Sequence, residues 1–209
     1  MEQYLKPTEF LNFDEREIRE MIQRVVESST TEKEKASVLF NFVRDRIPYN
    51  PYQNIFKRDI YKANTILNSE SNFCVPKAIL LTAMCRGAGI PARLRFASIR
   101  NRLMSEKLLS LMKSDVIHGH GFSEIYINGA WIQATPAFDS ELSAKNGYTI
   151  VTFDGENHSI LPSHDVHGNP HVEYLWYSES FDDFPLEWYI EYVRSKYDGF
   201  TEEALAVWG

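Results

Sequence analysis

The chain has 209 residues, of which 44% are hydrophobic and 24% charged, and its formal net charge at pH 7 is −7. No Pro/Gly/Ser-rich or single-charge run divides it, so we expect one domain over residues 1–209 with a full hydrophobic core. Scattered lysines and arginines argue against nucleic-acid binding, and no basic amphipathic stretch indicates a membrane surface. Met1 to Asp14 lacks the charged and apolar segments of a signal peptide, so we expect a cytoplasmic protein.

The N-terminal third predicts two amphipathic helices. Asn12 with Glu15, and Thr31 with Glu34, have the spacing of a helix capping box. Apolar side chains follow at helical spacing after each pair: Ile18, Ile22 and Val25, then Ala36, Leu39, Phe40 and Val43. An irregular stretch is expected from Pro48 to about Asn72.

Val75 to Arg86 is apolar on nearly every side and predicts a buried central helix, with Pro76 in its first turn. Cys74 then stands at the N-terminal end of this helix, and Cys85 lies within it. Two residues 11 positions apart on a helix are roughly 16 Å from each other. This exceeds the ~7 Å limit for a disulfide, so we expect two independent thiols.

After Pro91 the pattern changes to a strand, and residues 103–113 fit either a short amphipathic helix or a mobile flap. The segment from His120 to Thr135 predicts a hairpin turning at Asn128-Gly129. A two-residue turn sets Ile127 opposite Ala130. Extending that register places His120 diagonal to Thr135 and, if pairing continues past Pro136, to Asp139.

The remainder is predicted to be loop-rich over residues 140–171 and then helical. Asp183 is the expected cap of the last helix, Pro185 its first-turn residue, and Asp198-Gly199 its end.

The arrangement of Cys74 and His120 suggests nucleophilic catalysis. A thiol attacks as the thiolate, and a helix N-terminus with a nearby imidazole lowers the pKa of a cysteine. Cys74 has the first feature by position, and His120 on a strand could supply the second. Cys85, inside the apolar helix, fits a space-filling residue.

Two segments, FCVPKAILLTAMCRGAGIPARL and HGHGFSEIYINGAWIQATPAFD, resemble in this order the core of the transglutaminase-like superfamily. The resemblance covers about residues 30–140 and suggests a small, bacterial-type member. It implies a papain-like α+β fold, with the nucleophile at the N-terminus of a central buried helix that packs on an antiparallel sheet. It also implies that Cys74 is the nucleophile and His120 the base.

The third catalytic position departs from the family pattern. The pattern has Asp four residues after the tryptophan of the hairpin, whereas Trp131 is followed at that distance by Thr135. A threonine hydroxyl can accept from an imidazole but adds no negative charge. Asp139 would restore the charge, so we expect Asp139, or alternatively Thr135, to orient His120.

Two other groups of residues have competing interpretations. Arg93 could bind substrate, but pairing with the carboxylate of Glu124 on the hairpin is the stronger interpretation. Six histidines and two aspartates could form a metal site of the kind found in metal hydrolases; these are His118, His120, His158, His164, His167, His171, Asp154 and Asp165. A polar loop without metal is the favoured interpretation of that group.

The sequence therefore predicts a cysteine-dependent acyl-transfer enzyme acting on a peptide or amide substrate, without a cofactor or metal. Hydrolysis is favoured over transamidation, because no further domain and no recognisable calcium loop suggest a means of keeping water from the thioester. The alternatives are a protein-crosslinking transglutaminase, a non-catalytic binding module on the same fold, and the metal hydrolase.

Overall fold

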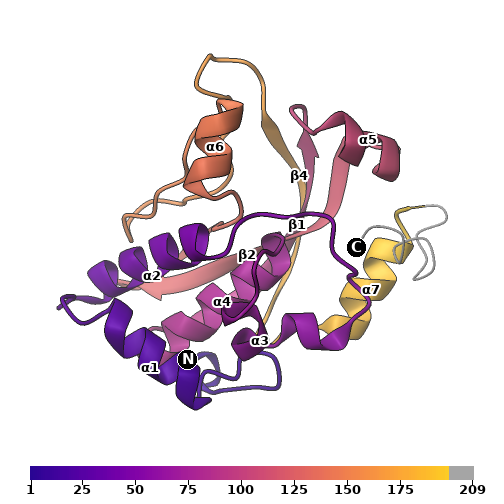
Figure 1. Ribbon diagram of the computed structural model, residues 1–209. Coiled ribbons are helices and arrows are strands. Elements are labelled where there is room, and N and C mark those ends of the chain that lie inside the picture. The colour runs from indigo at the N-terminus through magenta and orange to yellow at the C-terminus, as the bar shows by residue number, and fades with distance from the viewer. Residues whose placement is uncertain (198–209) are drawn as a thin grey trace.

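The structure is a computed structural model in which residues 1–197 are described (Figure 1). Its sheet has four antiparallel strands in the order β3-β2-β1-β4. These are β1 (Ala92–Asn101), β2 (Val116–Ile127), β3 (Ala130–Ala134) and β4 (Val172–Phe181). The expected α+β class is therefore correct.

Helix α4 (Cys74–Gly87) forms the centre of the molecule and packs against β2 and β1. All its residues from Cys74 to Arg86 are buried, as expected for a helix that is apolar on almost every side. Figure 1 shows α4 in front of the curled sheet, with α1 and α2 on one side and α3 below. Both cysteines lie on α4 as free thiols, as the spacing predicts.

The two N-terminal helices are α1 (Arg16–Val25) and α2 (Glu32–Arg46). The capping box at Thr31 and Glu34 is present, with both reciprocal hydrogen bonds formed. The one predicted at Asn12 and Glu15 is wrong, because α1 starts without a side-chain cap. The Asn12 side chain instead exchanges hydrogen bonds with Asn64 at the start of the short helix α3 (Ala63–Leu67).

The hairpin has the predicted register, with Ile127 opposite Ala130 and Ser123 opposite Ala134. Asn128 and Gly129 both have positive φ, 52° and 86°, as a tight two-residue turn requires. The extension of this register to Asp139 is wrong, because β3 ends at Ala134. The Thr135 N–H then donates to the Ser159 carbonyl at 2.9 Å instead of pairing with β2.

The segment 103–113 contains a helix, α5 (Glu106–Met112). Within the expected loop region lies α6 (Ser140–Asn146), and the next element, β4, was not predicted. Two short 3-10 helices complete the elements, η1 (Glu2–Leu5) and η2 (Arg58–Tyr61).

The last helix, α7 (Leu186–Arg194), begins after Pro185 and has no side-chain cap. The predicted cap, Asp183, instead accepts from Thr8 Oγ1 and from the Phe184 N–H. The predicted end at Asp198-Gly199 lies outside the described residues. No helix in the described part of the chain has the length and apolar character needed to span a bilayer.

Candidate active site

Cys74 is the first residue of α4 and is only 6% exposed. The backbone N–H groups of Gly121, Val75 and Cys74 itself lie near enough to its sulfur to lower the pKa of the thiol, although none of the described hydrogen bonds ends on the sulfur. The first two N–H groups of a helix have no carbonyl partner within it, so they are free to face an anion. This arrangement can stabilise negative charge on the sulfur or on an oxygen bound next to it.

His120 precedes Gly121 on β2, and the backbone of Gly121 lies close to the first turn of α4. The close approach requires glycine at position 121. A Cβ there would come within 2.9 Å of Val75 Cγ2 and 3.0 Å of Val75 Cα. Gly121 thus lets β2 contact the first turn of α4, with His120 next to it in the chain on the strand and Cys74 next to Val75 on the helix. No hydrogen bond links the two side chains themselves in the described structure.

Burial shifts the pKa values of the pair in opposite directions. It raises the pKa of Cys74 to about 11, although the three N–H groups and Lys77 lower it. It also lowers the pKa of His120 to about 3. Near neutral pH the Cys74 thiol and the His120 imidazole are therefore both uncharged. The sequence-based expectation of a lowered cysteine pKa is wrong in direction, because desolvation exceeds the effect of the helix N-terminus.

Tyr174 lies next to His120, and Thr135 lies next to Tyr174. His120 Nε2 and Thr135 Oγ1 are completely buried, and neither makes a well-formed hydrogen bond. The Tyr174 ring meets the His120 ring edge-on, with centroids 6.0 Å apart, and its hydroxyl is close enough to Thr135 for a weak interaction. Tyr174 was missed by the sequence analysis because strand β4 was missed, although Val172 and Tyr174 alternate with polar residues.

Asp139 has different partners from those predicted. Its Oδ1 accepts from the Leu142 N–H at 2.8 Å, which caps α6, and its Oδ2 accepts from the Tyr49 N–H at 2.8 Å. Both carboxylate oxygens are thus engaged with backbone, and none of the described hydrogen bonds reaches His120. Neither Asp139 nor Thr135 makes a hydrogen bond to His120 among the described residues, so Asp139, Thr135 and neither of them all remain open as the answer to what orients the imidazole.

Lys77, one turn after Cys74, was not predicted to have a special role. It is fully buried, and its Nζ donates to the carbonyls of Arg44 and Ile47 at 2.8 and 2.6 Å. These carbonyls lie at the C-terminus of α2, where helix carbonyls lack partners. Lys77 and Asp139 together therefore hold the chain just before and at Tyr49, beside the candidate site.

The predicted pair of Arg93 and Glu124 is confirmed. Arg93 Nε lies 2.7 Å from Glu124 Oε2, and the buried carboxylate also binds Arg95 and Ser180. These contacts join β2, β1 and β4, so Arg93 has a structural role in the sheet.

A small apolar pocket opens beside Cys74, with a volume of about 80 Å³. Its lining includes His118, whose Nδ1 is hydrogen-bonded to Ser98 Oγ, which in turn is bonded to the Tyr192 hydroxyl. A second hollow of about 230 Å³ lies on the other side of α5 and shares Tyr49, Pro51, Leu108 and Ile117 with the first. The four shared residues make the two hollows neighbours.

The histidine-rich segment does not assemble into a metal site. No group of three or more His, Cys, Asp or Glu side chains within the described residues is placed to hold a metal ion. His158 Nδ1 accepts from the Gln133 N–H and His164 Nδ1 is bonded to Ser163. Asp154 and Asp165 each close a local turn by accepting backbone N–H groups.

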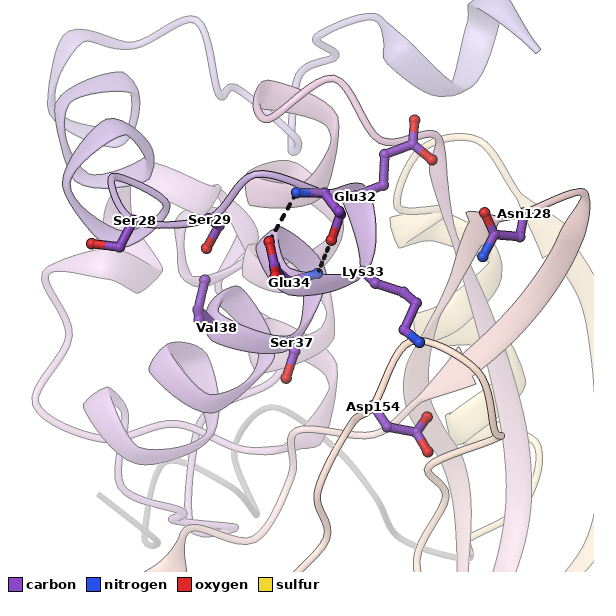
Figure 2. A pocket seen from close by; sticks show the side chains of 10 residues that line it. Ser28, Ser29, Glu32, Lys33, Glu34, Ser37, Val38, Asn128 and Asp154 are labelled. Carbon is purple, nitrogen blue, oxygen red and sulfur yellow. Dashed lines mark hydrogen bonds between the residues drawn. The ribbon is translucent and has the colours of Figure 1, made fainter.

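A more open hollow lies far from Cys74 along the chain, at the N-terminus of α2 (Figure 2). Its polar groups are already paired: Glu34 accepts from the N–H groups of Thr30 and Thr31, and Lys33 pairs with Glu156. The dashed lines at Glu34 in Figure 2 are the capping box. Among the described residues, no cysteine and no histidine lines this hollow, so it is a less suitable site for the predicted chemistry than the one at Cys74.

Comparison with known proteins identifies the superfamily of the chain. A sequence model of the transglutaminase-like superfamily core matches residues 19–136, which is more than half of the chain. The chain belongs to this superfamily. No curated protein matches it in sequence.

Two solved structures resemble the fold. One, named a "putative cysteine protease" from Cytophaga hutchinsonii, is 16% identical, with a TM-score of 0.49 over 85% of this chain and 52% of its own. The other, a "putative protease" from Parabacteroides distasonis, is 18% identical, with a TM-score of 0.40 over 60% of this chain and 25% of its own. The chain thus spans about half the length of the first protein and a quarter of the second.

Proposed function

We propose that the protein is a cysteine-dependent acyl-transfer enzyme that hydrolyses amide or peptide bonds, on a papain-like arrangement of helix and sheet. The proton of the Cys74 thiol passes to His120 as the sulfur attacks the substrate carbonyl. His120 then gives this proton to the departing amine, and a thioester on Cys74 remains. Water, deprotonated by His120, attacks the thioester and releases the acid and the free thiol.

The observation that carries this proposal is the convergence of backbone N–H groups on the Cys74 sulfur. The N–H groups of Cys74 and Val75 come from the helix start, and that of Gly121 comes from the residue after His120. Donors from two elements near one buried sulfur favour its thiolate form, which is the form that attacks a carbonyl. Hydrogen bonds between nucleophile and base are often long before substrate binds, so the missing Cys74–His120 bond is compatible with catalysis.

The neutral resting pair sets the expected kinetics. Because burial raises the pKa of Cys74 and lowers that of His120, a thiolate–imidazolium pair is unfavourable before substrate binds. Proton transfer must then accompany bond formation. We expect slow turnover, with activity rising above neutral pH as the thiolate becomes accessible.

The test is hydrolysis of a panel of peptidyl aminocoumarin amides between pH 6 and 10. Cys74→Ala and His120→Ala should each abolish measurable cleavage. Two control variants, Cys85→Ala and His164→Ala, should retain it, because Cys85 lies inside α4 and His164 is exposed. Full cleavage by Cys74→Ala, with no amide in the panel requiring that thiol, would overturn the proposal.

Hydrolysis is placed ahead of transamidation because transfer to an amine requires water to be kept away from the thioester. Adding a primary amine such as cadaverine to the same reactions compares water with the amine as acceptor of the acyl group. Release of free acid as the main product supports hydrolysis, whereas incorporation of the amine as the main product identifies a transglutaminase.

A non-catalytic binding module is a second candidate, favoured by one observation: the His120 imidazole lacks a carboxylate partner and Thr135 stands in its place. In that case Cys74→Ala would leave the binding of a peptide ligand unchanged. The wild type itself would cleave no amide.

A further inference from the structure

We propose that the pocket beside Cys74 binds the aliphatic side chain of the acyl residue of the substrate, and that it selects branched side chains of the size of valine or leucine. This inference rests on the proposed function, since it assigns the substrate class of the same thiol. It makes the enzyme an amidase or peptidase specific for aliphatic residues at the carbonyl side of the cleaved bond.

The chemistry of the lining excludes charged side chains. Fourteen residues line the pocket, and none is Asp, Glu, Lys or Arg: Tyr49, Pro51, Gln53, Ile55, Phe73, Cys74, Leu108, Met112, Ile117, His118, Gly119, Tyr189, Val193 and Tyr197. The one imidazole among them is neutral at pH 7, because burial and Lys196 lower the pKa of His118. A charged substrate group entering here would lose its hydration without gaining a partner.

The volume limits the size of the side chain. At about 80 Å³ the pocket is roughly half as large as the ~150 Å³ apolar cavities that accept benzene. A branched aliphatic group fits this space, whereas an aromatic side chain exceeds it. A larger side chain would have to displace the closely packed apolar walls, and such overpacking destabilises the fold.

The position of the pocket links it to the reacting atom. Cys74 belongs to the lining, so a side chain in the pocket holds the adjacent carbonyl next to the sulfur. Opposite, α7 supplies Val193 and Tyr189. The backbone of β2 approaches them closely, since a Cβ on Gly119 would lie 2.8 Å from Tyr189 and 3.1 Å from Val193. The far wall is thus fixed by α7, and Leu108 and Met112 of α5 form the remaining apolar side.

The first experiment measures kcat/KM for acetyl-X-aminocoumarin amides in which X is Gly, Ala, Val, Leu, Phe, Asp or Lys. We expect Val or Leu to exceed Gly by at least ~10-fold, since each methylene in an apolar pocket contributes roughly tenfold or more, and Phe, Asp and Lys to be poor substrates. Val193→Ala enlarges the pocket and should move the preference towards Phe. Leu111→Ala, an exposed residue of α5 outside the lining, should leave the preference unchanged.

A second measurement needs no turnover. Alkylation of Cys74 by N-isobutyl iodoacetamide and by unsubstituted iodoacetamide is compared at pH 8.5, with glutathione as the reference thiol. The alkylation rate with the isobutyl reagent, divided by the rate with iodoacetamide, should be ~10-fold higher for Cys74 than for glutathione. Val193→Ala should change this ratio. Equal ratios for Cys74 and glutathione would overturn the inference.

The two measurements separate the two proposals. Cleavage of amides without preference for X overturns the pocket assignment and leaves the hydrolase. An isobutyl preference at Cys74 without cleavage of any amide supports the pocket and overturns the hydrolase.

Discussion

Thr135 occupies the sequence position at which the family pattern has a carboxylate. His120 Nε2 and Thr135 Oγ1 are both buried without a well-formed hydrogen bond. An uncharged neighbour cannot stabilise the imidazolium that forms when His120 accepts the thiol proton. In the proposed mechanism, Cys74 and His120 therefore act with weak support for the charge that moves between them.

This account predicts a gain of function in Thr135→Asp. A carboxylate next to Nε2 should raise the pKa of His120 and increase kcat/KM for amide cleavage by ~10-fold or more at pH 7. Thr135→Asn, of nearly the same shape but uncharged, is the control and should give a much smaller increase. The pH–rate profiles of the two variants provide the measurement. Equal profiles for Asp and Asn would show that charge at this position does not assist His120.

His120 should also make the fold sensitive to acid. Its pKa is about 3 in the folded protein against an ordinary value of 6.5. As the pH falls below about 6.5, the unfolded chain binds a proton that the native state refuses, so stability is present above this pH and is lost progressively towards about pH 3. The loss approaches ~1.4 kcal/mol per pH unit.

Urea unfolding at pH 7.5 and 5.5 measures this effect. From pH 7.5 to pH 5.5 the free energy of unfolding of the wild type should fall by about 1 kcal/mol more than that of His120→Gln, which lacks the titrating group. His164→Gln, at an exposed histidine, should behave as the wild type. The same loss in His120→Gln as in the wild type would mean that another group is responsible.

At the scale of elements, the contact between β2 and the first turn of α4 determines whether the site forms. Gly121→Ala places a Cβ 2.9 Å from Val75 Cγ2 and 3.0 Å from Val75 Cα, and the backbone atom cannot rotate away. The strand must move from the helix, which removes the Gly121 N–H from Cys74 Sγ. We expect a loss of at least ~10-fold in cleavage rate, with destabilisation of about 1–3 kcal/mol.

Gly129→Ala is the matched control for that prediction. Its cost comes from a positive φ of 86° in the hairpin turn, and a Cβ there meets nothing within 4 Å. It should destabilise the fold by about 1–2 kcal/mol yet leave the cleavage rate of the folded protein unchanged. If Gly129→Ala lowered the cleavage rate as much as Gly121→Ala, the contact between β2 and α4 at Cys74 would not explain the loss.

Local signals predicted the elements that depend on local interactions. The apolar run of α4 and the Asn128-Gly129 turn determine their structures within a few residues, and both were predicted. The Asn12 box failed because Asn12 has a distant partner, Asn64, that its own segment does not reveal. The register beyond Ala134 failed for the same reason, since Ser159 takes the place of β2 as the partner of Thr135.

The residues of the candidate site also divide into those that the local sequence predicts and those that only tertiary packing places there. Cys74 and His120 could be named because helix start, strand and motif order are properties of the sequence. Tyr174, His118 and Lys77 could not, because their relevance arises from the packing of β4, α7 and α2 around α4. The register predicted at Asp139 was wrong because parity along a strand says nothing once the strand has ended.

At the scale of the whole molecule, buried Lys77 ties the core helix α4 to the C-terminus of α2. Burial lowers the pKa of Lys77 to about 7, with Asp139 and Asp45 opposing the shift. Between about pH 7 and the ordinary lysine value of 10.5, the unfolded chain binds a proton that the native state does not. The contribution of Lys77 to stability should therefore rise with pH across this window.

Lys77→Met tests this link, because it keeps an apolar stem of similar length and removes the titrating amine. The difference in free energy of unfolding between the wild type and Lys77→Met should grow in favour of the wild type from pH 7 to pH 10. Comparison with Lys145→Met, an exposed lysine, controls for net charge. A difference that stays constant across this range would show that Lys77 has the same pKa in both states.

The most direct test of the central claim is the intact mass of the protein seconds after mixing with a p-nitrophenyl ester of N-acetyl-leucine. The account predicts one added acyl group, located on the peptide that contains Cys74, which decays as water hydrolyses the thioester. It should form in Cys85→Ala and be absent in Cys74→Ala. Absence of any adduct in the wild type, or an adduct that forms equally in Cys74→Ala, would contradict the assignment of Cys74 as the nucleophile.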